Sequence, residues 1–246
     1  MKPWNYFKSL KSLVYTHAGM NADYSIVEND GKLFVSFEKT SGSLDWLFNL
    51  LFIPIFILIP FTVIKLTSVL SIVFIVLGII ELVCLIIFCV KYFPKKPYKR
   101  MESIWRVHFG IALLYGSIRD EVMSKIKEYV EKGITEIYVG GWSQGGGVAI
   151  MCVEDIFYQT GIKPTLTTFG APRVPFGKKS KERIENACGF NSNCYENSSD
   201  VVPHLPLLIW GFKSLCTHHI GERFNIFKIF KTAKWHTDYG NEELYK

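Results

Sequence analysis

The chain has 246 residues, a hydrophobic content of 49% and a formal net charge of +6 at pH 7. This length fits one sizeable open-sheet domain or two small ones. Positive residues gather at 91–100 and at 178–183, but no nucleic-acid recognition motif accompanies either cluster. The charge pattern therefore argues against nucleic acid and favours an anionic membrane surface as the partner.

Residues 1–15 mix lysines with scattered aromatic side chains and contain no continuous apolar run, so no cleavable signal peptide is expected. The six cysteines form neither a C-x-x-C pair nor a zinc-ligand spacing. We therefore expect reduced thiols and no metal site, with a disulfide between Cys188 and Cys194 as the alternative.

The first predicted elements are two strands, Tyr24–Glu28 and Leu33–Phe37, in which apolar and polar residues alternate. Between them stands Asn29-Asp30-Gly31, and Asp-Gly is a preferred pair in tight hairpin turns. This segment predicts a β-hairpin.

Two long apolar segments follow, 47–64 and 69–90. The second is long enough to span a bilayer as a helix, and its apolar side chains contribute roughly 5 to 10 kcal/mol to insertion against a cost of about 3 for Glu81. The first contains Pro54 and Pro60, which favour a kinked or re-entrant helix. We expect a hydrophobic helical hairpin, and the alternative is a pair of buried core elements in a soluble domain.

After this block the pattern becomes that of a globular α/β domain. Apolar residues at helical spacing predict a helix over 117–133, with Ser117 as N-cap and Gly133 as the stop. The next predicted elements are a strand over 134–139, a helix over 144–159 closed by Gly161, a strand over 165–169 and a strand over 193–196. Strand, helix and strand in this order predict a parallel sheet.

The motif Gly141-Trp142-Ser143-Gln144-Gly145 joins the 134–139 strand to the helix that follows. Such a sharp turn can hold a serine hydroxyl out of the backbone toward a base, provided that the flanking residues have almost no side chain. Gly141 and Gly145 meet that demand, and we predict that Ser143 is a nucleophile. The alternative is a glycine-rich turn with an incidental serine.

A nucleophilic serine needs a base and a carboxylate that orients the base. Asp200 lies just after the 193–196 strand, at the carboxyl end where open α/β sheets assemble their sites. Three histidines follow it in the order Ser, Asp, His that α/β-hydrolases use: His218, His219 and His236. The residues alone leave the choice among these three open, although the loop that bears His236 has enough chain to return over the serine.

Several segments of the chain resemble motifs of the class 3 (fungal-type) triacylglycerol lipases and follow one another in the order that this family has. The resemblance extends over most of the chain outside the apolar block. The matching pieces are 33–40 with Asp45-Trp46, Val107–Gly110 with Tyr115-Gly116, Gly141–Gly146, Thr168–Val174, Asp200–Pro206 and His236 with Tyr239. The resemblance implies an α/β-hydrolase fold with a mainly parallel central sheet, and a lipase activity that needs no cofactor.

The same resemblance distinguishes the histidines. His236 with Tyr239 resembles the terminal H-x-x-Y that supplies the base, whereas the segment that begins at His219 resembles a part of the family that is not catalytic. Carried over, the backbone N–H groups of Thr40 and Gln144 would form the oxyanion hole. The catalytic residues implied are therefore Ser143, Asp200 and His236.

This chain departs from the family at three places. Glu38-Lys39 stands where the family has Arg-Gly, and Trp142 and Gln144 replace the usual His and Leu on either side of the serine. The apolar block lies where the family has a lid and a short connection. The predicted organisation is a catalytic domain over 1–46 and 94–246, interrupted by a membrane hairpin or lid over 47–93.

The strands on either side of the insertion must belong to one sheet, so the insertion must begin and end on the same side of any membrane. A hairpin that turns at Lys65–Ser68 satisfies this, and the positive residues of 91–100 place the catalytic domain on the cytoplasmic side. A lid that lies in one leaflet is the alternative.

We therefore predict a membrane-anchored serine esterase that hydrolyses carboxylic esters of acylglycerols or related lipids through an acyl-enzyme. The alternatives within the same chemistry are a phospholipase A1 or a diacylglycerol lipase. A catalytically inactive lipase-like membrane scaffold is the alternative from a different class, which the Glu38-Lys39 departure permits.

Overall fold

The computed structural model describes residues 1–19, 22–38, 107–188, 192–215, 217–221 and 232–246. The predicted oxyanion residue Thr40 and the predicted insertion 47–93 lie outside these ranges. Within the described part of the chain, no helix combines the length and the apolar character that a membrane crossing requires.

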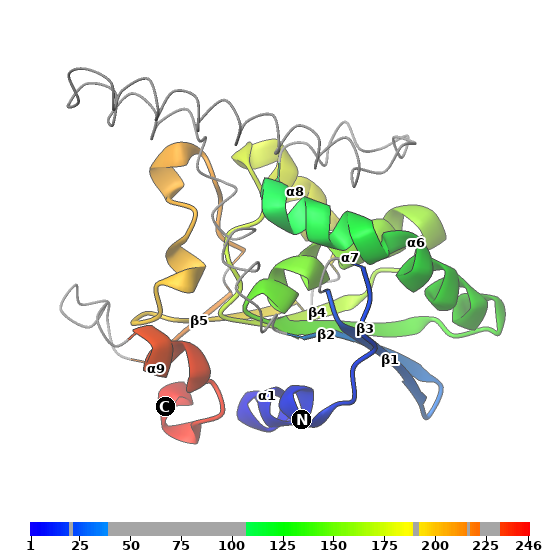
Figure 1. The fold of residues 1–246 in the computed structure, drawn as a ribbon, viewed down its shortest axis with the longest axis horizontal. Coiled ribbons are helices and arrows are strands. Elements are labelled where there is room, and N and C mark those ends of the chain that lie inside the picture. The colour runs from blue at the N-terminus through cyan, green and yellow to red at the C-terminus, as the bar shows by residue number, and fades with distance from the viewer. Residues whose placement is uncertain (20–21, 39–106, 189–191, 216, 222–231) are drawn as a thin grey trace, which may run out of the picture.

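One six-stranded sheet organises the described residues, with the strands in the order in which they occur in the chain (Figure 1). The first two strands pair antiparallel and every later neighbour pairs parallel. The strands are β1 (Tyr24–Asn29), β2 (Lys32–Phe37), β3 (Glu136–Trp142), β4 (Thr165–Phe169), β5 (Asn193–Asn197) and β6 (His218–Ile220). The predicted mainly parallel sheet is confirmed.

The predicted hairpin is confirmed, and its turn explains the Asp-Gly pair. Asp30 has a φ of +52° and Gly31 a φ of +72°. Positive φ at both central residues defines a type I′ turn, whose twist matches that of the flanking strands. Asn29 consequently pairs with Lys32 at the first rung of the ladder.

Helices cover both faces of the sheet (Figure 1). Those on one side are α6 (Phe109–Glu131), α7 (Gln144–Thr160) and α8 (Gly177–Ala187), and those on the other are α1 (Pro3–Ser12) and α9 (Thr232–Thr237). Short 3₁₀ helices are η2 (Val202–His204), η3 (Leu208–Trp210) and η5 (Glu242–Tyr245).

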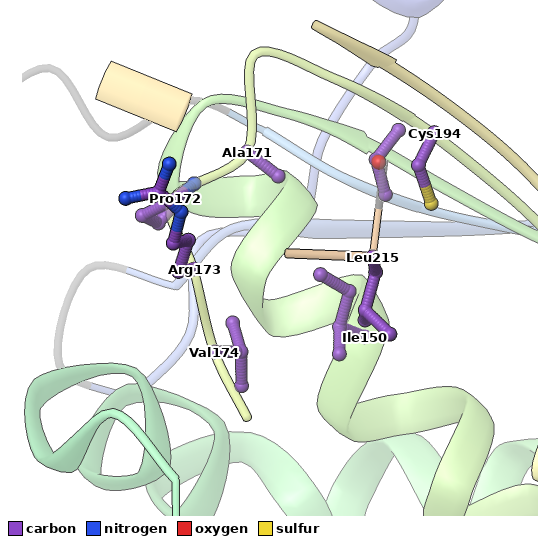
Figure 2. Close-up of a pocket in the computed structure, with 8 residues that line it drawn as sticks. Ile150, Ala171, Pro172, Arg173, Val174, Cys194 and Leu215 are labelled. Carbon is purple, nitrogen blue, oxygen red and sulfur yellow. The ribbon is translucent and has the colours of Figure 1, made fainter. Parts of the chain in front are cut away.

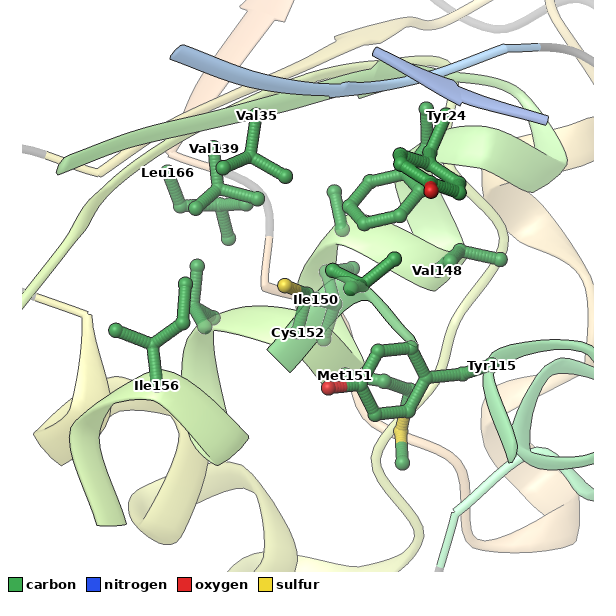
Figure 3. Packing of buried hydrophobic residues seen from close by; sticks show 14 of the residues in the cluster. Tyr24, Val35, Tyr115, Val139, Val148, Ile150, Met151, Cys152, Ile156 and Leu166 are labelled. Atoms are coloured by element: carbon green, nitrogen blue, oxygen red, sulfur yellow. The ribbon is translucent and has the colours of Figure 1, made fainter. Parts of the chain in front are cut away.

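The main core lies between the sheet and helices α6 and α7. Figure 3 shows Val35, Val139 and Leu166, from three adjacent strands, above the side chains of α7. Helix α7 is buried along most of its length, from Gln144 to Ile156, and ends as predicted at Gly161, which has a φ of +77°. This burial fixes the start of α7, and with it the turn that bears Ser143.

Strand β3 ends three residues later than predicted, at Trp142. Gly140 and Gly141 weaken the strand pattern in the sequence, yet both pair with β2 and β4. A Cβ atom on Gly140 would lie 2.2 Å from the hydroxyl of Tyr6 in α1. This glycine therefore permits the close approach of α1 to the sheet.

The predicted start of helix α6 at Ser117 is wrong. The helix begins at Phe109, and the His108 side chain caps it by accepting a hydrogen bond from the Ile111 N–H at 3.4 Å. Ser117 lies inside the helix and donates its hydroxyl to the Leu114 carbonyl. The first turns are buried on nearly all sides, so they lack the one-sided periodicity that identifies an amphipathic helix.

Helices α1 and α8 were not predicted from the sequence either. Pro3 occupies the first turn of α1, where proline is favoured, and Phe7 and Leu10 bury one face in a second core with Phe169 and Tyr239. Helix α8 contains the 178–183 positive cluster, in which Lys178 and Lys181 pair with acidic residues one turn later and Arg183 pairs with Glu154.

Cys188 and Cys194 are both free thiols, so the alternative of a disulfide between them is wrong. Each side chain is buried in the core, and burial raises the pKa of the Cys194 thiol to about 11. Burial also raises the pKa of the Cys188 thiol above its ordinary range. Neither sulfur is in the reactive thiolate form near neutral pH.

Candidate active site

Ser143 occupies the turn between β3 and α7 in a strained backbone conformation, with φ +58° and ψ −129°. Its N–H donates to the Phe169 carbonyl of β4 at 2.8 Å, which holds the turn against the sheet. Such strain in a non-glycine residue persists only where the surroundings impose it, and it is typical of nucleophile elbows.

The two glycines of the motif are required by contacts with backbone atoms. A Cβ atom on Gly141 would lie 2.4 Å from the Gly145 carbonyl oxygen, and one on Gly145 would lie 2.4 Å from the Phe37 carbonyl oxygen. Both distances are far shorter than a van der Waals contact, and backbone atoms cannot rotate away. The steric reason for expecting G-x-S-x-G at an elbow therefore holds in this chain.

Three predicted site residues meet at this turn. The Nε2 atom of His236 lies 2.7 Å from Ser143 Oγ, and its Nδ1 atom lies 2.6 Å from Asp200 Oδ2. Asp200 is fully buried, whereas the side chains of Ser143 and His236 retain a little exposure. The arrangement can accept a proton from the serine on one imidazole nitrogen while the carboxylate holds the other.

Asp200 is held by two further donors. The Val202 N–H donates to Oδ1 at 2.9 Å, and the Tyr239 hydroxyl donates to Oδ2 at 2.9 Å. Gly170 lies directly against this carboxylate, because a Cβ atom there would be 2.9 Å from Oδ2. These contacts fix the orientation of the carboxylate toward His236.

Tyr239 holds the Asp200 carboxylate, a role that the sequence did not reveal. Its hydroxyl accepts a hydrogen bond from the Asn197 N–H at 3.0 Å while donating to Asp200. Complete burial and the adjacent negative charge of Asp200 raise its pKa well above the ordinary value, so the hydroxyl remains a donor. The signal in the sequence was its position three residues after His236.

Trp142 is the second residue whose role was missed. Its indole N–H donates to the backbone carbonyl of His236 at 3.0 Å, and its ring lies 5.6 Å from the imidazole. The ammonium group of Lys11 lies 4.6 Å from the centre of the indole and donates to the Thr237 carbonyl at 3.4 Å. The elbow and α1 therefore both hold the segment that bears His236.

His236 belongs to α9 rather than to a loop, which corrects the predicted local structure. The other two candidate histidines lie on the edge strand β6, which β4 and β5 separate from β3. His218 is hydrogen-bonded to Asn193, and His219 is exposed. Of the three histidines left open by the residues alone, His236 is the one that the structure brings to Ser143.

Gln144 is the first residue of α7 and is 1% exposed. Its amide follows the serine at the positive end of the helix dipole, a position suited to stabilising an oxyanion. The role of Thr40 as the second donor stays a prediction, because Thr40 lies outside the described residues.

Among the residues that the structure describes, no group of three or more His, Cys, Asp or Glu side chains could hold a metal ion. Figure 2 shows a small pocket between α7 and the loop after β4, lined by Ile150, Arg173 and Cys194 among others. It has room for no more than about one water molecule, which is too little for a substrate.

The elbow, the parallel sheet and the hydrogen-bonded Ser143, His236 and Asp200 define the α/β-hydrolase class of fold. The family model of class 3 lipases matches residues 88–210, which is half of the chain. The chain therefore belongs to the class 3 lipase family.

A lipase of Rhizomucor miehei is 28% identical over 124 residues, which cover 48% of this chain and 32% of that lipase. The match thus spans about a third of the length of this relative. The solved structure of the triacylglyceride lipase from the same organism aligns with 85% of this chain and 64% of its own, with 17% identity and a TM-score of 0.54. Lipase II from Rhizopus niveus aligns with 84% of this chain and 64% of its own, with 15% identity and a TM-score of 0.53. At these identities the structural likeness establishes the fold.

Proposed function

We propose that this protein is a serine esterase that hydrolyses carboxylic ester bonds of lipids. The observation that carries the proposal is the continuous hydrogen-bonded chain from Ser143 Oγ through His236 to the buried carboxylate of Asp200, with distances of 2.7 and 2.6 Å. The strained elbow and the exclusion of any Cβ atom at Gly141 and Gly145 support the same function, because both serve to present the serine.

In the proposed reaction, His236 Nε2 takes the proton from Ser143 Oγ as the oxygen attacks the ester carbonyl carbon. The tetrahedral intermediate then collapses, the ester C–O bond breaks, and the alcohol leaves with the proton from His236. Water attacks the resulting acyl-enzyme in the same way and releases the fatty acid. Asp200 keeps the imidazole oriented and stabilises its positive charge in both steps.

The oxyanion of each intermediate would be bound by the backbone N–H of Gln144, at the start of α7, and by that of Thr40. Each such donor contributes on the order of 10²–10³ in turnover in serine hydrolases. The Gln144 contribution is supported by its place directly after the serine and at the N-terminus of a 17-residue helix.

Acylglycerols are the proposed substrate class. Family membership supports a lipid ester, and the Rhizomucor miehei relative is named a triacylglyceride lipase. Diacylglycerols and the acyl ester of phospholipids are the alternatives, because all three present the same carbonyl group to Ser143.

We further propose that the 47–93 insertion anchors the enzyme in a membrane as a hairpin, with the catalytic domain on the cytoplasmic side. The support is the apolar composition of 47–64 and 69–90 together with the positive residues of 91–100. An anchor in the lid region would keep Ser143 close to substrates whose acyl chains stay in the bilayer.

Hydrolysis assays on the full-length protein test the chemistry. We expect release of fatty acid from triolein, diolein or phosphatidylcholine, and the preferred substrate identifies the class. His236→Ala should lower turnover by several orders of magnitude, as removal of a triad member does. His219→Ala, at an exposed histidine on β6, is the matched control and should retain turnover. A folded protein that hydrolyses none of these esters would be the inactive scaffold.

Extraction of membranes at alkaline pH tests the anchor. The full-length protein should stay in the membrane fraction after carbonate treatment, whereas a version with residues 48–92 replaced by a Gly/Ser linker should not. Recovery of the full-length protein in the soluble fraction without detergent would contradict the anchor.

A further inference from the structure

Four of the seven large hydrophobic side chains that are exposed in the described part of the chain gather at one place. Ile209 is 85% exposed, Leu208 52%, Phe176 42% and Leu207 38%. We refer to these four residues as the apolar tip. Exposed apolar side chains forgo the favourable free energy that their burial would supply, so a cluster of them indicates a partner.

Hydrogen bonds hold both ends of the segment that bears Leu207, Leu208 and Ile209. The buried guanidinium group of Arg173 donates to the carbonyls of His204 and Pro206, the second at 3.0 Å, and the Arg173 N–H donates to the Leu205 carbonyl at 2.8 Å. The turn itself is closed by the Gly211 N–H, which donates to the Leu208 carbonyl at 3.0 Å. The tip is therefore presented on an ordered framework.

Phe176 joins the tip through a short two-stranded contact. The Gly177 N–H donates to the Gly211 carbonyl at 2.9 Å, and the Lys213 N–H donates to the Pro175 carbonyl at 2.8 Å. The ring of Phe176 packs edge-on against that of Phe212 with 5.3 Å between centroids. Segments 175–177 and 211–213 thus lie side by side.

Lysines adjoin this contact on both segments: Lys178 and Lys179 in the first turn of α8, and Lys213 in the other segment. Cations in the first turn oppose the helix dipole, and α8 has no acidic residue there. The pair of Lys178 with Glu182, at 3.5 Å, also has the less favourable order of charges along a helix. Helix stability therefore does not account for these lysines.

The apolar tip and the nucleophile lie at the same end of the sheet, where the parallel strands have their carboxyl ends. Phe176 belongs to the connection that follows β4, and Leu207–Ile209 belong to the connection that follows β5. Both strands run parallel to β3, whose carboxyl end bears Ser143. Figure 1 shows the segment after β5, in orange, on the side of the sheet that α7 and α8 cover.

We propose that the apolar tip inserts into the headgroup region of an anionic bilayer, with Lys178, Lys179 and Lys213 against lipid phosphates. The apolar side chains supply burial and each lysine supplies electrostatic attraction, the combination that peripheral membrane sites use. This contact turns the carboxyl end of the sheet, where Ser143 lies, toward the lipid. The inference rests on the proposed function for its purpose, and it is independent of the 47–93 anchor.

The test places an environment-sensitive fluorescent amino acid at position 209 of the full-length protein, with position 14 as the matched control, since Val14 is 89% exposed. Vesicles of phosphatidylcholine, with and without phosphatidylglycerol, and lipids with brominated acyl chains are the probes. We expect a blue shift and bromine quenching at 209, stronger with phosphatidylglycerol, and neither at 14. The proposal would be overturned if the emission of the fluorophore at position 209 stayed that of an aqueous environment when vesicles were present. It would also be overturned if the emission shifted equally without vesicles as the protein concentration rose, which would indicate that the tip binds a second copy of the chain.

Charge and polarity variants give the functional readout. Leu208→Glu with Ile209→Glu, and separately Lys178→Gln with Lys179→Gln, should lower the ratio of vesicle-lipid to soluble-ester hydrolysis by about tenfold or more. Val14→Glu, and Lys127→Gln with Lys132→Gln, are the controls and should keep the ratio. An unchanged ratio in both tip variants would contradict the proposal. Fluorophosphonate labelling of the wild type is scored separately, so absence of esterase activity would refute the proposed function while the fluorescence result still decides insertion.

Discussion

Replacement of Gly170 by alanine should both destabilise the fold and displace the carboxylate of the triad. Gly170 follows β4 with a φ of +55°, and a Cβ atom there would lie 2.9 Å from Asp200 Oδ2 and 2.9 Å from Tyr239 Cε2. Both neighbours are 0% exposed, so neither can retreat into solvent. The carboxylate that orients His236 must therefore shift.

Gly161 is the matched control, because it has a φ of +77° and no atom within 4 Å of the position that a Cβ would take. Alanine in the left-handed region costs about 1–2 kcal/mol at either site, and overpacking adds about 1–3 kcal/mol at Gly170 alone. A displacement of about 1 Å in a catalytic group costs on the order of 100-fold in turnover. Gly170→Ala should therefore lose roughly 2–5 kcal/mol of unfolding free energy and about 100-fold in kcat.

Urea denaturation and hydrolysis of a short soluble ester measure the two quantities on the same preparations. Gly161→Ala should lose about 1–2 kcal/mol of unfolding free energy and keep its kcat. Equal kcat in the two alanine variants, with both folded, would refute the view that Gly170 makes room for the Asp200 carboxylate.

Three further predictions concern individual side chains. Trp142→Phe keeps a ring but loses the bond to the His236 carbonyl, so kcat on a soluble ester should fall about tenfold, as a bond of about 1–1.5 kcal/mol would imply; an unchanged kcat would contradict this role. Tyr239→Phe removes a donor to Asp200 and should lower the unfolding free energy by about 1.5–3 kcal/mol in urea denaturation, and a loss below about 0.5 would count against the bond. Burial raises the pKa of the Cys194 thiol from 9.0 to about 11, so this thiol should escape iodoacetamide at pH 8 until urea is added. The free energy of unfolding should also fall as the pH rises from about 9 to about 11, because the thiol of the unfolded chain loses its proton first. Alkylation of native Cys194, read by peptide mass spectrometry, would be the contrary result.

The parts of the fold that could be predicted from the sequence are those specified by local chemistry. The Asp30-Gly31 turn needs positive φ at both residues, and the nucleophile elbow needs glycine at positions 141 and 145. Both features could therefore be identified from their short local motifs. The end of α7 was equally local, because Gly161 adopts the left-handed conformation that closes a helix.

Features that depend on distant contacts could not be predicted. The Trp142 to His236 bond joins residues 94 positions apart, and the Tyr239 to Asp200 bond joins residues 39 apart. No local pattern reports such pairs. The start of α6 was missed because its first turns are buried on nearly all sides, and α1 was missed because only Phe7 and Leu10 of its ten residues are buried.

The local sequence could not identify which of the three downstream histidines is the base. Spacing left His218, His219 and His236 open, and only the resemblance to a family motif favoured the last. In the structure the same choice follows from the geometry, since its two ring nitrogens lie 2.7 Å from Ser143 Oγ and 2.6 Å from Asp200 Oδ2.

The central claim is that Ser143 is an activated nucleophile, and covalent labelling with a fluorophosphonate tests it most directly. The reagent phosphonylates a serine only when a base removes its proton, so peptide mass spectrometry of the labelled full-length protein should find one adduct, on the peptide that contains Ser143. The Ser143→Ala protein should take up no label and His236→Ala very little. An adduct on another residue, or equal labelling of the wild type and the Ser143→Ala protein, would contradict the assignment.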